Sequence, residues 1–249
     1  MSIVLLPLEG IPEVRPEDDL AAHLGAAIET SRYGLKDGDV VVVCQKIVSK
    51  AEGRVVDLCD VTPSDRAREF ALAYDKDARV VELALRESEE VLRMADGHLI
   101  TSTAGGFIAA NSGLDRSNQS AADRVTLLPL NSDASAEHLR HRLHVRFGVR
   151  VAVIITDTFG RPWRMGQIDV AIGVAGMEVL DDFGGRSDRA GRVLEHTSIA
   201  VADQVAAAAG MAMGKADGIP AVLVRGAPIS EGRGRAVDLV RPREQDLFR

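Results

Sequence analysis

The chain alternates between short apolar runs and stretches in which apolar residues recur at helical spacing. The clearest run is Val40 to Val48, which is apolar enough for a strand that is covered on both faces. Leu20, Leu24 and Ile28 instead repeat every four residues, the spacing of one face of a helix. This mixture predicts an α+β fold with mixed sheets and packed helices, although it does not reveal the order of the strands.

Turn residues and helix caps divide the chain into predicted elements. Thr62 and Pro63 are typical of a helix start, and Gly148 is typical of a helix end. Gly160 and Pro162 are expected to interrupt regular structure. Helices are expected over residues 16–31, 63–73, 78–87 and 135–147 and within 195–213. Strands are expected over residues 3–8, 40–48, 91–94, 98–103, 125–130, 151–155, 168–174, 177–180 and 221–225.

The apolar run 151–155 leads into the segment that carries the most suggestive chemistry. Asp157 and Thr158 follow the predicted strand directly, and Arg161 and Arg164 come soon after. A carboxylate is a ligand for a hard cation, and one guanidinium group can bind two phosphate oxygens at once. The segment therefore suits a metal-bound phosphate. The alternative is an Asp-Thr turn whose two arginines form surface ion pairs, and this segment alone does not decide between them.

A second segment, residues 105–118, strengthens the functional interpretation. It has an apolar core followed by a polar, glycine-containing loop that ends in Asp115 and Asn118. Asp115 can share a divalent ion with Asp157, because Mg²⁺ and Mn²⁺ prefer oxygen ligands and usually retain several waters. Asn118 can donate a side-chain N–H to a phosphate.

These two segments resemble the coenzyme F420-0:L-glutamate ligase family, and other blocks of the chain match the same family in the same order. The matching blocks are residues 6–14, 37–43, 46–53, 110–118, 156–164, 201–203 and 224–226. The resemblance implies one F420 gamma-glutamyl ligase-like domain over residues 1–249, in an intertwined homodimer. It implies a GTP-dependent ligase that adds L-glutamate to coenzyme F420-0, and then to F420-1 through γ-linkages, by way of an acyl phosphate.

The resemblance also implies the roles of individual residues. Asp115 and Asp157 would be the catalytic carboxylates and would hold the first of two divalent ions, Mg²⁺ or Mn²⁺, and Thr158 would contribute to the second. A monovalent K⁺ ion is implied as well. The implied nucleotide contacts are Ile11, Pro12, Glu13, Val14, Gln45, Lys46, Lys50, Asn118, Gly214, Lys215, Ala216 and Asp217.

Lys215 departs from the family pattern, because some relatives have a glutamine there that helps to hold the second metal ion. A charged lysine cannot ligate a cation. Two interpretations remain open: the second ion has fewer protein ligands in this chain, or Lys215 takes over part of the charge neutralisation.

Composition narrows the class of protein. The chain has 249 residues, of which 46% are hydrophobic and 27% charged, so a folded globular protein is expected. Its net charge of −7 argues against general nucleic-acid binding, which needs a basic surface. The start of the chain lacks a secretory signal, and residues 197–213 suit a buried helix better than a membrane span. A cytoplasmic protein with no membrane or nucleic-acid partner is therefore expected.

Other motifs are weaker. The stretch 210–215 is similar to a phosphate-binding loop, but it has the wrong glycine spacing and Ala216 in place of a serine or threonine. His138, His141 and His144 occur at three-residue steps, yet neighbouring arginines favour a surface helix over a zinc site. Two other functions remain open, a metal-dependent phosphotransferase or phosphatase that uses Asp115 and Asp157, and a non-catalytic protein that binds a nucleotide or F420.

Overall fold

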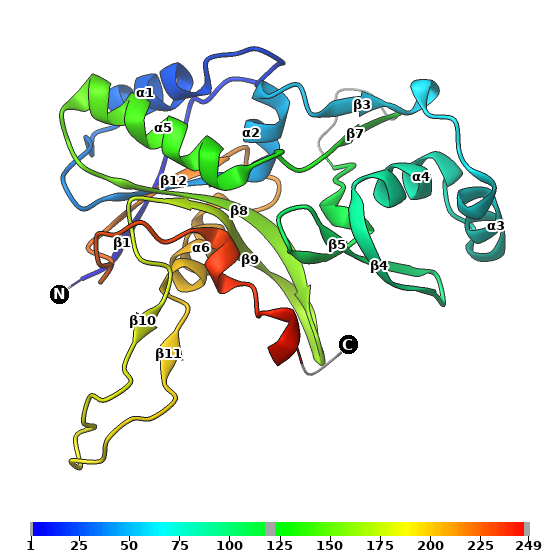
Figure 1. Cartoon of the computed structure of the whole chain (residues 1–249). Helices are drawn as coiled ribbons and strands as arrows, with labels where there is room; N and C mark the ends of the chain where they lie inside the picture. The colour runs from blue at the N-terminus through cyan, green and yellow to red at the C-terminus, as the bar shows by residue number, and fades with distance from the viewer. Residues whose placement is uncertain (1, 118–122, 247–249) are drawn as a thin grey trace.

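A five-stranded mixed sheet forms the centre of the molecule (Figure 1). The computed structural model describes residues 2–117 and 123–246. Within the sheet, β2 and β8 run parallel, and the other neighbouring strands run antiparallel. In spatial order the strands are β1 (Val4–Pro7), β12 (Ala221–Arg225), β2 (Val40–Cys44), β8 (Ala152–Arg161) and β9 (Arg164–Ala175).

Helices cover both faces of this sheet. Helices α1 (Leu20–Thr30) and α5 (Ser132–Phe147) lie on one face, and α6 (Val201–Met213) lies on the other (Figure 1). Side chains alternate along a strand, so Val41 and Val43 join the apolar core on the first face, and Val40 and Val42 join the core on the second. This burial on both sides explains why the β2 sequence is an uninterrupted run of valines.

A smaller group of elements lies beside the central sheet (Figure 1). It has apolar cores of its own, built around Phe70, Leu99, Leu58 and Val125. Its elements are α3 (Asp65–Tyr74), α4 (Ala78–Arg86), the three-stranded sheet β4 (Ser88–Ala95), β5 (His98–Thr103) and β6 (Ile108–Ala110), and the antiparallel pair β3 (Val55–Asp57) and β7 (Arg124–Thr126).

The remaining elements are short. Helix α2 (Gln45–Ala51) follows β2 directly, and β10 (Asp181–Asp182) pairs with β11 (Ser198–Ile199) at the base of an arm that extends away from the sheet (Figure 1). Single 3₁₀ turns occur at Leu58–Asp60, Asn111–Gly113, Ala236–Leu239 and Arg243–Gln245. Among the helices of the described residues, none combines the length and apolar character needed to cross a membrane.

The predicted α+β class, with mixed sheets and packed helices, is confirmed, but the strand predicted over residues 40–48 is wrong in its second half. The strand ends at Cys44, and α2 begins at Gln45. Ile47 and Val48 pack against the core on the first face of the sheet, and they satisfy helical spacing as well as a strand pattern. Periodicity alone cannot separate these two readings of a short apolar run.

The expected interruption at Gly160 is also wrong. Strand β8 continues through Gly160, which pairs with Gln167 of β9, and the chain turns only at residues 162–163. Trp163 has a positive φ of 55° in this turn. Pro162 lies outside the paired residues, where its missing N–H removes no ladder hydrogen bond. The result is a long antiparallel hairpin.

Several predicted boundaries shift because other residues cap the helices. Ser64, rather than Thr62, caps α3, and its hydroxyl accepts a hydrogen bond from the Ala67 N–H at 3.3 Å. Asp19 caps α1, so this helix starts later than predicted. Gly148 ends α5 with a φ of 70°, as predicted. The strand predicted over 125–130 shortens to β7, and the strand predicted over 177–180 does not form.

Candidate functional site

The candidate site lies at the sheet edge where the parallel strands β2 and β8 reach their carboxyl ends. Cys44, the last residue of β2, pairs with Thr156 of β8. The residues that follow in each segment, Lys46 on α2 and Asp157 on β8, therefore start from the same edge of the sheet. Ligand sites of open α/β sheets commonly occupy this position, outside the carboxyl ends of parallel strands.

Asp115 reaches this edge from the loop after β6. Its backbone exchanges two hydrogen bonds of 2.9 Å with Thr126 of β7, which fixes the loop. Its carboxylate lies 2.8 Å from the Lys46 ammonium and accepts a hydrogen bond from the Ser117 N–H at 2.7 Å. Burial raises the pKa of Asp115, but the hydrogen bonds from Lys46 and Ser117 outweigh burial, so its pKa lies below the usual value.

Asp157 has the opposite electrostatic character. Its pKa is raised to about 7, chiefly by burial and further by the nearby carboxylates of Asp115 and Asp169, while the Thr158 N–H and the Lys215 ammonium oppose the rise. The structure thus brings Asp115 and Asp157 close enough for their charges to interact. A bound cation would stabilise the ionised forms of two carboxylates that lie this close to each other.

Thr158, Asp169 and Lys215 form a second polar group next to Asp157. Thr158 and Asp169 face each other across the β8–β9 hairpin, and the Thr158 hydroxyl donates to Asp169 Oδ1 at 2.5 Å. The Lys215 ammonium donates to Thr158 Oγ1 at 2.5 Å and to Asp169 Oδ1 at 3.2 Å. Gly210, near the carboxyl end of α6, packs against the same carboxylate: a Cβ there would lie 2.0 Å from Asp169 Oδ2, so a larger residue would displace the Asp169 side chain.

The sequence interpretation did not select Asp169. Its signal was an acidic residue inside a predicted apolar strand, next to Ile168 and Val170. An acidic residue in such a strand needs a polar partner, and here it has Thr158 and Lys215.

The predicted nucleotide contacts from the early part of the chain lie in two segments. Residues 11–14 follow β1, and Glu13 forms an ion pair of 2.6 Å with Lys50 of α2. Lys46 and Lys50 are four residues apart on one helix and therefore share a face. Gln45 is buried, and its side-chain oxygen accepts a hydrogen bond from the Ser49 hydroxyl at 2.8 Å, so this side chain already has a partner inside the protein.

The later predicted contacts differ in how they are placed. Gly214 to Asp217 form the turn after α6, where Gly214 has a positive φ of 60° and Lys215 reaches Thr158. Asn118 lies outside the described residues. Arg161 donates to the Met165 carbonyl across the hairpin turn, and neither Arg161 nor Arg164 forms an ion pair with a residue that the structure describes. The alternative interpretation, in which these two arginines form surface ion pairs, therefore finds no such pair in the described part of the chain.

Asp115 and Asp157 fit a hard divalent cation. Mg²⁺ is usually held by one or two carboxylates together with water and substrate phosphate, so a full protein cage is not required. In the described residues, no group of three or more His, Cys, Asp or Glu side chains is arranged to hold a metal ion. The described histidines of α5 likewise form no such group. A two-carboxylate site that is completed by a phosphate ligand is consistent with this arrangement.

Two carboxylates and two lysines thus lie at the end of the parallel strands, a set of side chains that suits a divalent cation together with a phosphate-bearing ligand. Comparison with known proteins identifies the family. The family model for F420-0:gamma-glutamyl ligase matches residues 10–226, and the chain belongs to this family.

Individual relatives agree with this assignment. The coenzyme F420:L-glutamate ligase of Methanothermobacter thermautotrophicus is 43% identical over 252 residues, which cover 100% of both chains. The protein of the same name from Archaeoglobus fulgidus is 43% identical over 250 residues, 100% of this chain and 97% of the relative. The protein of that name from Methanocaldococcus jannaschii is 43% identical over 220 residues, 88% of each chain. The family resemblance drawn from the sequence is confirmed.

Proposed function

We propose that this protein is a GTP-dependent ligase that joins L-glutamate to coenzyme F420-0 and then extends the product through γ-linkages. The observation that supports the proposal most directly is the family match over residues 10–226, together with Asp115, Asp157 and Lys46 at one sheet edge. The names of the relatives describe ligases that act on coenzyme F420 and L-glutamate.

The reaction must overcome the poor reactivity of a carboxylate toward an amine. In the proposed route, an oxygen of the F420-0 carboxylate attacks the γ-phosphorus of GTP, the bond to the β-phosphate oxygen breaks, and GDP leaves. The resulting acyl phosphate is attacked by the amine of glutamate, phosphate leaves, the amine releases a proton, and an amide remains. Positioning and charge stabilisation supply much of the rate enhancement in phosphoryl transfer, so a protein nucleophile is unnecessary.

Each residue of the site then has a chemical role. The ammonium groups of Lys46 and Lys50 bind phosphate oxygens, which requires them to exchange part of their contacts with Asp115 and Glu13. Asp115 and Asp157 hold one divalent ion, Mg²⁺ or Mn²⁺. That ion, when bound, neutralises negative charge on the phosphates during transfer.

The position of a second ion is expected to differ between this chain and those relatives that have glutamine in place of Lys215. Thr158, its expected ligand, already bonds to the Lys215 ammonium and to Asp169. These contacts favour the second interpretation of Lys215, in which its fixed positive charge takes over part of the neutralisation that the second ion supplies in some relatives. We propose one divalent ion at Asp115 and Asp157, with Lys215 at the position of the other.

The proposal retains the homodimer and the K⁺ ion that the resemblance implies. Support for a partner subunit comes from the tip of the β8–β9 hairpin, where Trp163 is 81% exposed and Met165 is 97% exposed. Large apolar side chains that gather at an exposed tip mark an interaction surface.

Incubation with F420-0, GTP, Mn²⁺ and L-glutamate, followed by mass spectrometry, tests the proposed activity. The expected product is F420-1, with GDP and phosphate formed in equal amounts. Asp157→Asn should reduce turnover by at least about a hundredfold, because the cation loses one of its two carboxylates. Asp96→Asn is the matched control, since Asp96 is an exposed aspartate that pairs with Arg93 in the turn between β4 and β5.

The same experiment separates the two alternative functions. Phosphate release that does not require glutamate and yields no longer product would indicate a phosphotransferase or phosphatase. Binding of GTP or F420-0 without any turnover would indicate a non-catalytic binding protein. The ligase proposal is overturned if the folded protein binds GTP but forms no glutamyl adduct.

A further inference from the structure

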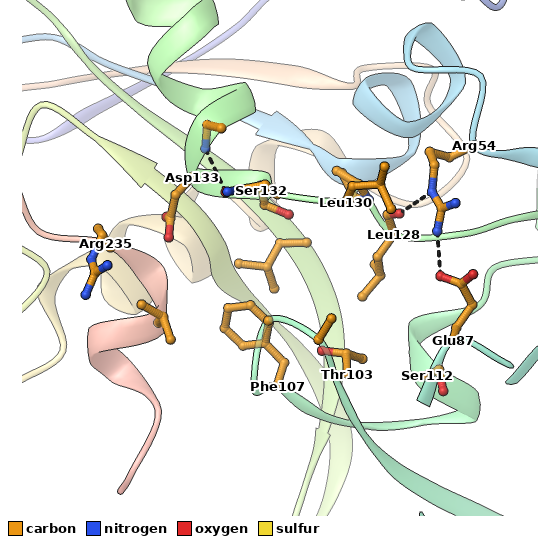
Figure 2. Close-up of a pocket in the computed structure, with 17 residues that line it drawn as sticks. Arg54, Glu87, Thr103, Phe107, Ser112, Leu128, Leu130, Ser132, Asp133 and Arg235 are labelled. Atoms are coloured by element: carbon orange, nitrogen blue, oxygen red, sulfur yellow. Dashed lines mark hydrogen bonds and ion pairs between the residues drawn. The ribbon is translucent and has the colours of Figure 1, made fainter. Parts of the chain in front are cut away.

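A cavity of about 370 Å³ lies between the start of α5, the turn after β5 and the segment that follows β7 (Figure 2). Much of its wall is apolar, with contributions from Phe107, Leu128, Ile172 and Val237. This size and lining suit a small organic ligand with an apolar body, because ligand sites are mostly apolar concavities with a few placed polar groups. None of these lining residues belongs to the carboxylate site described above.

The start of α5 supplies polar groups that suit an anion. Asn131 caps the helix by accepting a hydrogen bond from the Ala134 N–H at 3.0 Å. Within the described chain, the backbone N–H groups of Ser132 and Asp133 and the Ser132 hydroxyl have no hydrogen-bond partner. Figure 2 shows Ser132 at the wall of the cavity, and the positive end of the helix dipole lies at the same place.

Close packing fixes this helix start against the sheet. A Cβ on Gly173 of β9 would lie 2.4 Å from the Ser132 carbonyl oxygen, so only glycine allows α5 to begin so near the strand. Asp133 accepts hydrogen bonds from the N–H groups of Val174 and Ala236 at 2.8 and 2.9 Å, which directs its charge to the backbone. Both of these hydrogen bonds are accepted by Asp133 Oδ1, so this oxygen faces away from the N–H groups at the start of its own helix.

Thr103 provides a second, independent polar group on the cavity wall. Its side chain is only 7% exposed, and its hydroxyl has no hydrogen-bond partner among the described residues. Figure 2 shows this hydroxyl on the cavity wall, directed toward Phe107. The neighbouring buried hydroxyls of Thr101 and Ser112 are both hydrogen-bonded. Buried polar groups are normally paired, so the unpaired Thr103 hydroxyl needs an explanation.

Two guanidinium groups add positive charge at opposite sides of the cavity. Arg54 is held by the Leu128 carbonyl and by Glu87, so it braces the wall. Arg235 pairs with Asp238 on the surface, at the other side of the cavity.

We propose that this cavity binds an organic acid with an aromatic body. The acid group lies at the start of α5, on the amides of Ser132 and Asp133 and the Ser132 hydroxyl, and the Thr103 hydroxyl contributes a further hydrogen bond. The ring packs on Phe107, Leu128 and Ile172.

The identity of the ligand rests on the proposed function. Among the substrates of the proposed ligase, L-glutamate has no aromatic body, and the nucleotide is assigned to the carboxylate site, so the F420 compound fits this chemistry. The acid group held at the start of α5 is then a different one from the carboxylate that attacks GTP. The cavity also shares chain segments with the carboxylate site. Ser112 lies three residues before Asp115, and Leu128 lies two residues after Thr126, which bonds to Asp115.

Titration of the full-length protein with F420-0, followed by its fluorescence, tests the proposal. Ser132→Asp places a negative charge where the acid group binds, so the Kd for F420-0 should rise at least about tenfold through like-charge repulsion. The same substitution should not lower the Tm, because an aspartate at a helix start interacts favourably with the dipole. Ser187→Asp, in the exposed arm between β10 and β11, is the matched control and should leave the Kd unchanged.

Thr103→Val gives a second, independent readout. It removes an unpaired buried hydroxyl at nearly constant volume, so the Tm should rise or stay the same, while the Kd for F420-0 rises about three- to tenfold through the lost hydrogen bond. A residue with only a structural role would change the Tm and leave the Kd as it is.

The outcomes separate this proposal from the proposed function. If Ser132→Asp binds F420-0 as the wild-type protein does, the cavity assignment is overturned and the ligase proposal stands. If this variant loses glutamate binding but keeps F420-0 binding, the aromatic ligand class is wrong. Binding of GDP should be unchanged in Ser132→Asp, and a loss of GDP binding in parallel would contradict a separate site. If the wild-type protein does not bind F420-0, both proposals fall.

Discussion

Asp157 combines burial with two carboxylate neighbours, and together they raise its pKa to about 7. An aspartate in the unfolded chain has a pKa of about 3.9. At pH values between these two pKa values, the folded protein holds a proton on Asp157 that the unfolded chain has released. The free energy of unfolding therefore falls as the pH rises from about 4 through 7. A bound cation reverses the effect, because it favours the ionised carboxylate.

Asp157→Asn should therefore stabilise the metal-free protein at alkaline pH. We expect the free energy of unfolding to rise by about 1–2 kcal/mol at pH 8 and to be unchanged near pH 4, less than the full linkage because solvent reaches part of the site. Urea unfolding of both proteins at the two pH values measures this difference. Addition of Mn²⁺ and GDP should reverse the order, since only the wild-type protein keeps both carboxylates for the cation.

The exposed aspartate Asp96 provides the control, and Asp96→Asn should change the free energy of unfolding by less than about 0.5 kcal/mol at either pH. The interpretation of Asp157 is wrong if Asp157→Asn is less stable than the wild-type protein at pH 8 without metal.

At the scale of elements, Glu82 ties α4 to the start of α3. Its side chain is buried, and it accepts hydrogen bonds from the Ser64 hydroxyl and the Ser64 N–H at 2.6 and 2.9 Å, as well as one from Arg86. The hydrogen bond from the Ser64 hydroxyl lowers the pKa of Glu82 most, the Ser64 N–H and Arg86 lower it further, and burial opposes them, so the pKa lies at about 2. The N-cap residue of one helix is thus fixed by a carboxylate of the next.

Glu82→Gln should destabilise the protein at neutral pH. A depressed pKa contributes stability above the unfolded value of about 4.3, and this contribution is lost as the pH falls from about 5 to 2. We expect a loss of about 1–3 kcal/mol at pH 7 that becomes smaller in acid, measured by urea unfolding at pH 7 and pH 3. Glu69→Gln on the exposed face of α3 is the control, and an equal loss in both variants would contradict the assigned role of Glu82.

The elements also show how far sequence patterns reach. The period of apolar residues predicted most helices and strands, because it reports burial directly. It did not separate β2 from α2, since Ile47 and Val48 suit either state. It also gave no sign of the Thr158–Asp169 contact, which depends on the register of two strands that the sequence does not encode locally.

The residues of the candidate site also divide into those that the sequence predicted and those that it did not. Asp115 and Asp157 were selected because carboxylates in polar loops after apolar runs suit a cation, and because the family resemblance covers both segments. Asp169 and the position of Lys215 were missed or left open, since both depend on α6 packing against β9 through Gly210. Long-range packing of this kind is visible only in the folded molecule.

At the scale of the whole molecule, distant parts of the chain meet at one edge of the central sheet. The segment after β1, α2, the loop before β7, the β8–β9 hairpin and the turn after α6 each contribute predicted site residues. The parallel pairing of β2 and β8 places two of these segments, α2 and the β8–β9 hairpin, at a shared edge. The account of catalysis therefore depends on whether one cation joins the carboxylates of two of these segments.

X-ray diffraction from crystals grown with GDP and Mn²⁺, recorded at a wavelength where manganese scatters anomalously, tests this point most directly. The account predicts one manganese peak that is coordinated by the carboxylates of Asp115 and Asp157 and by phosphate oxygens, while Lys215 stays hydrogen-bonded to Thr158. A manganese ion bound to the nucleotide without either carboxylate, or carboxylates that face different surfaces, would contradict it.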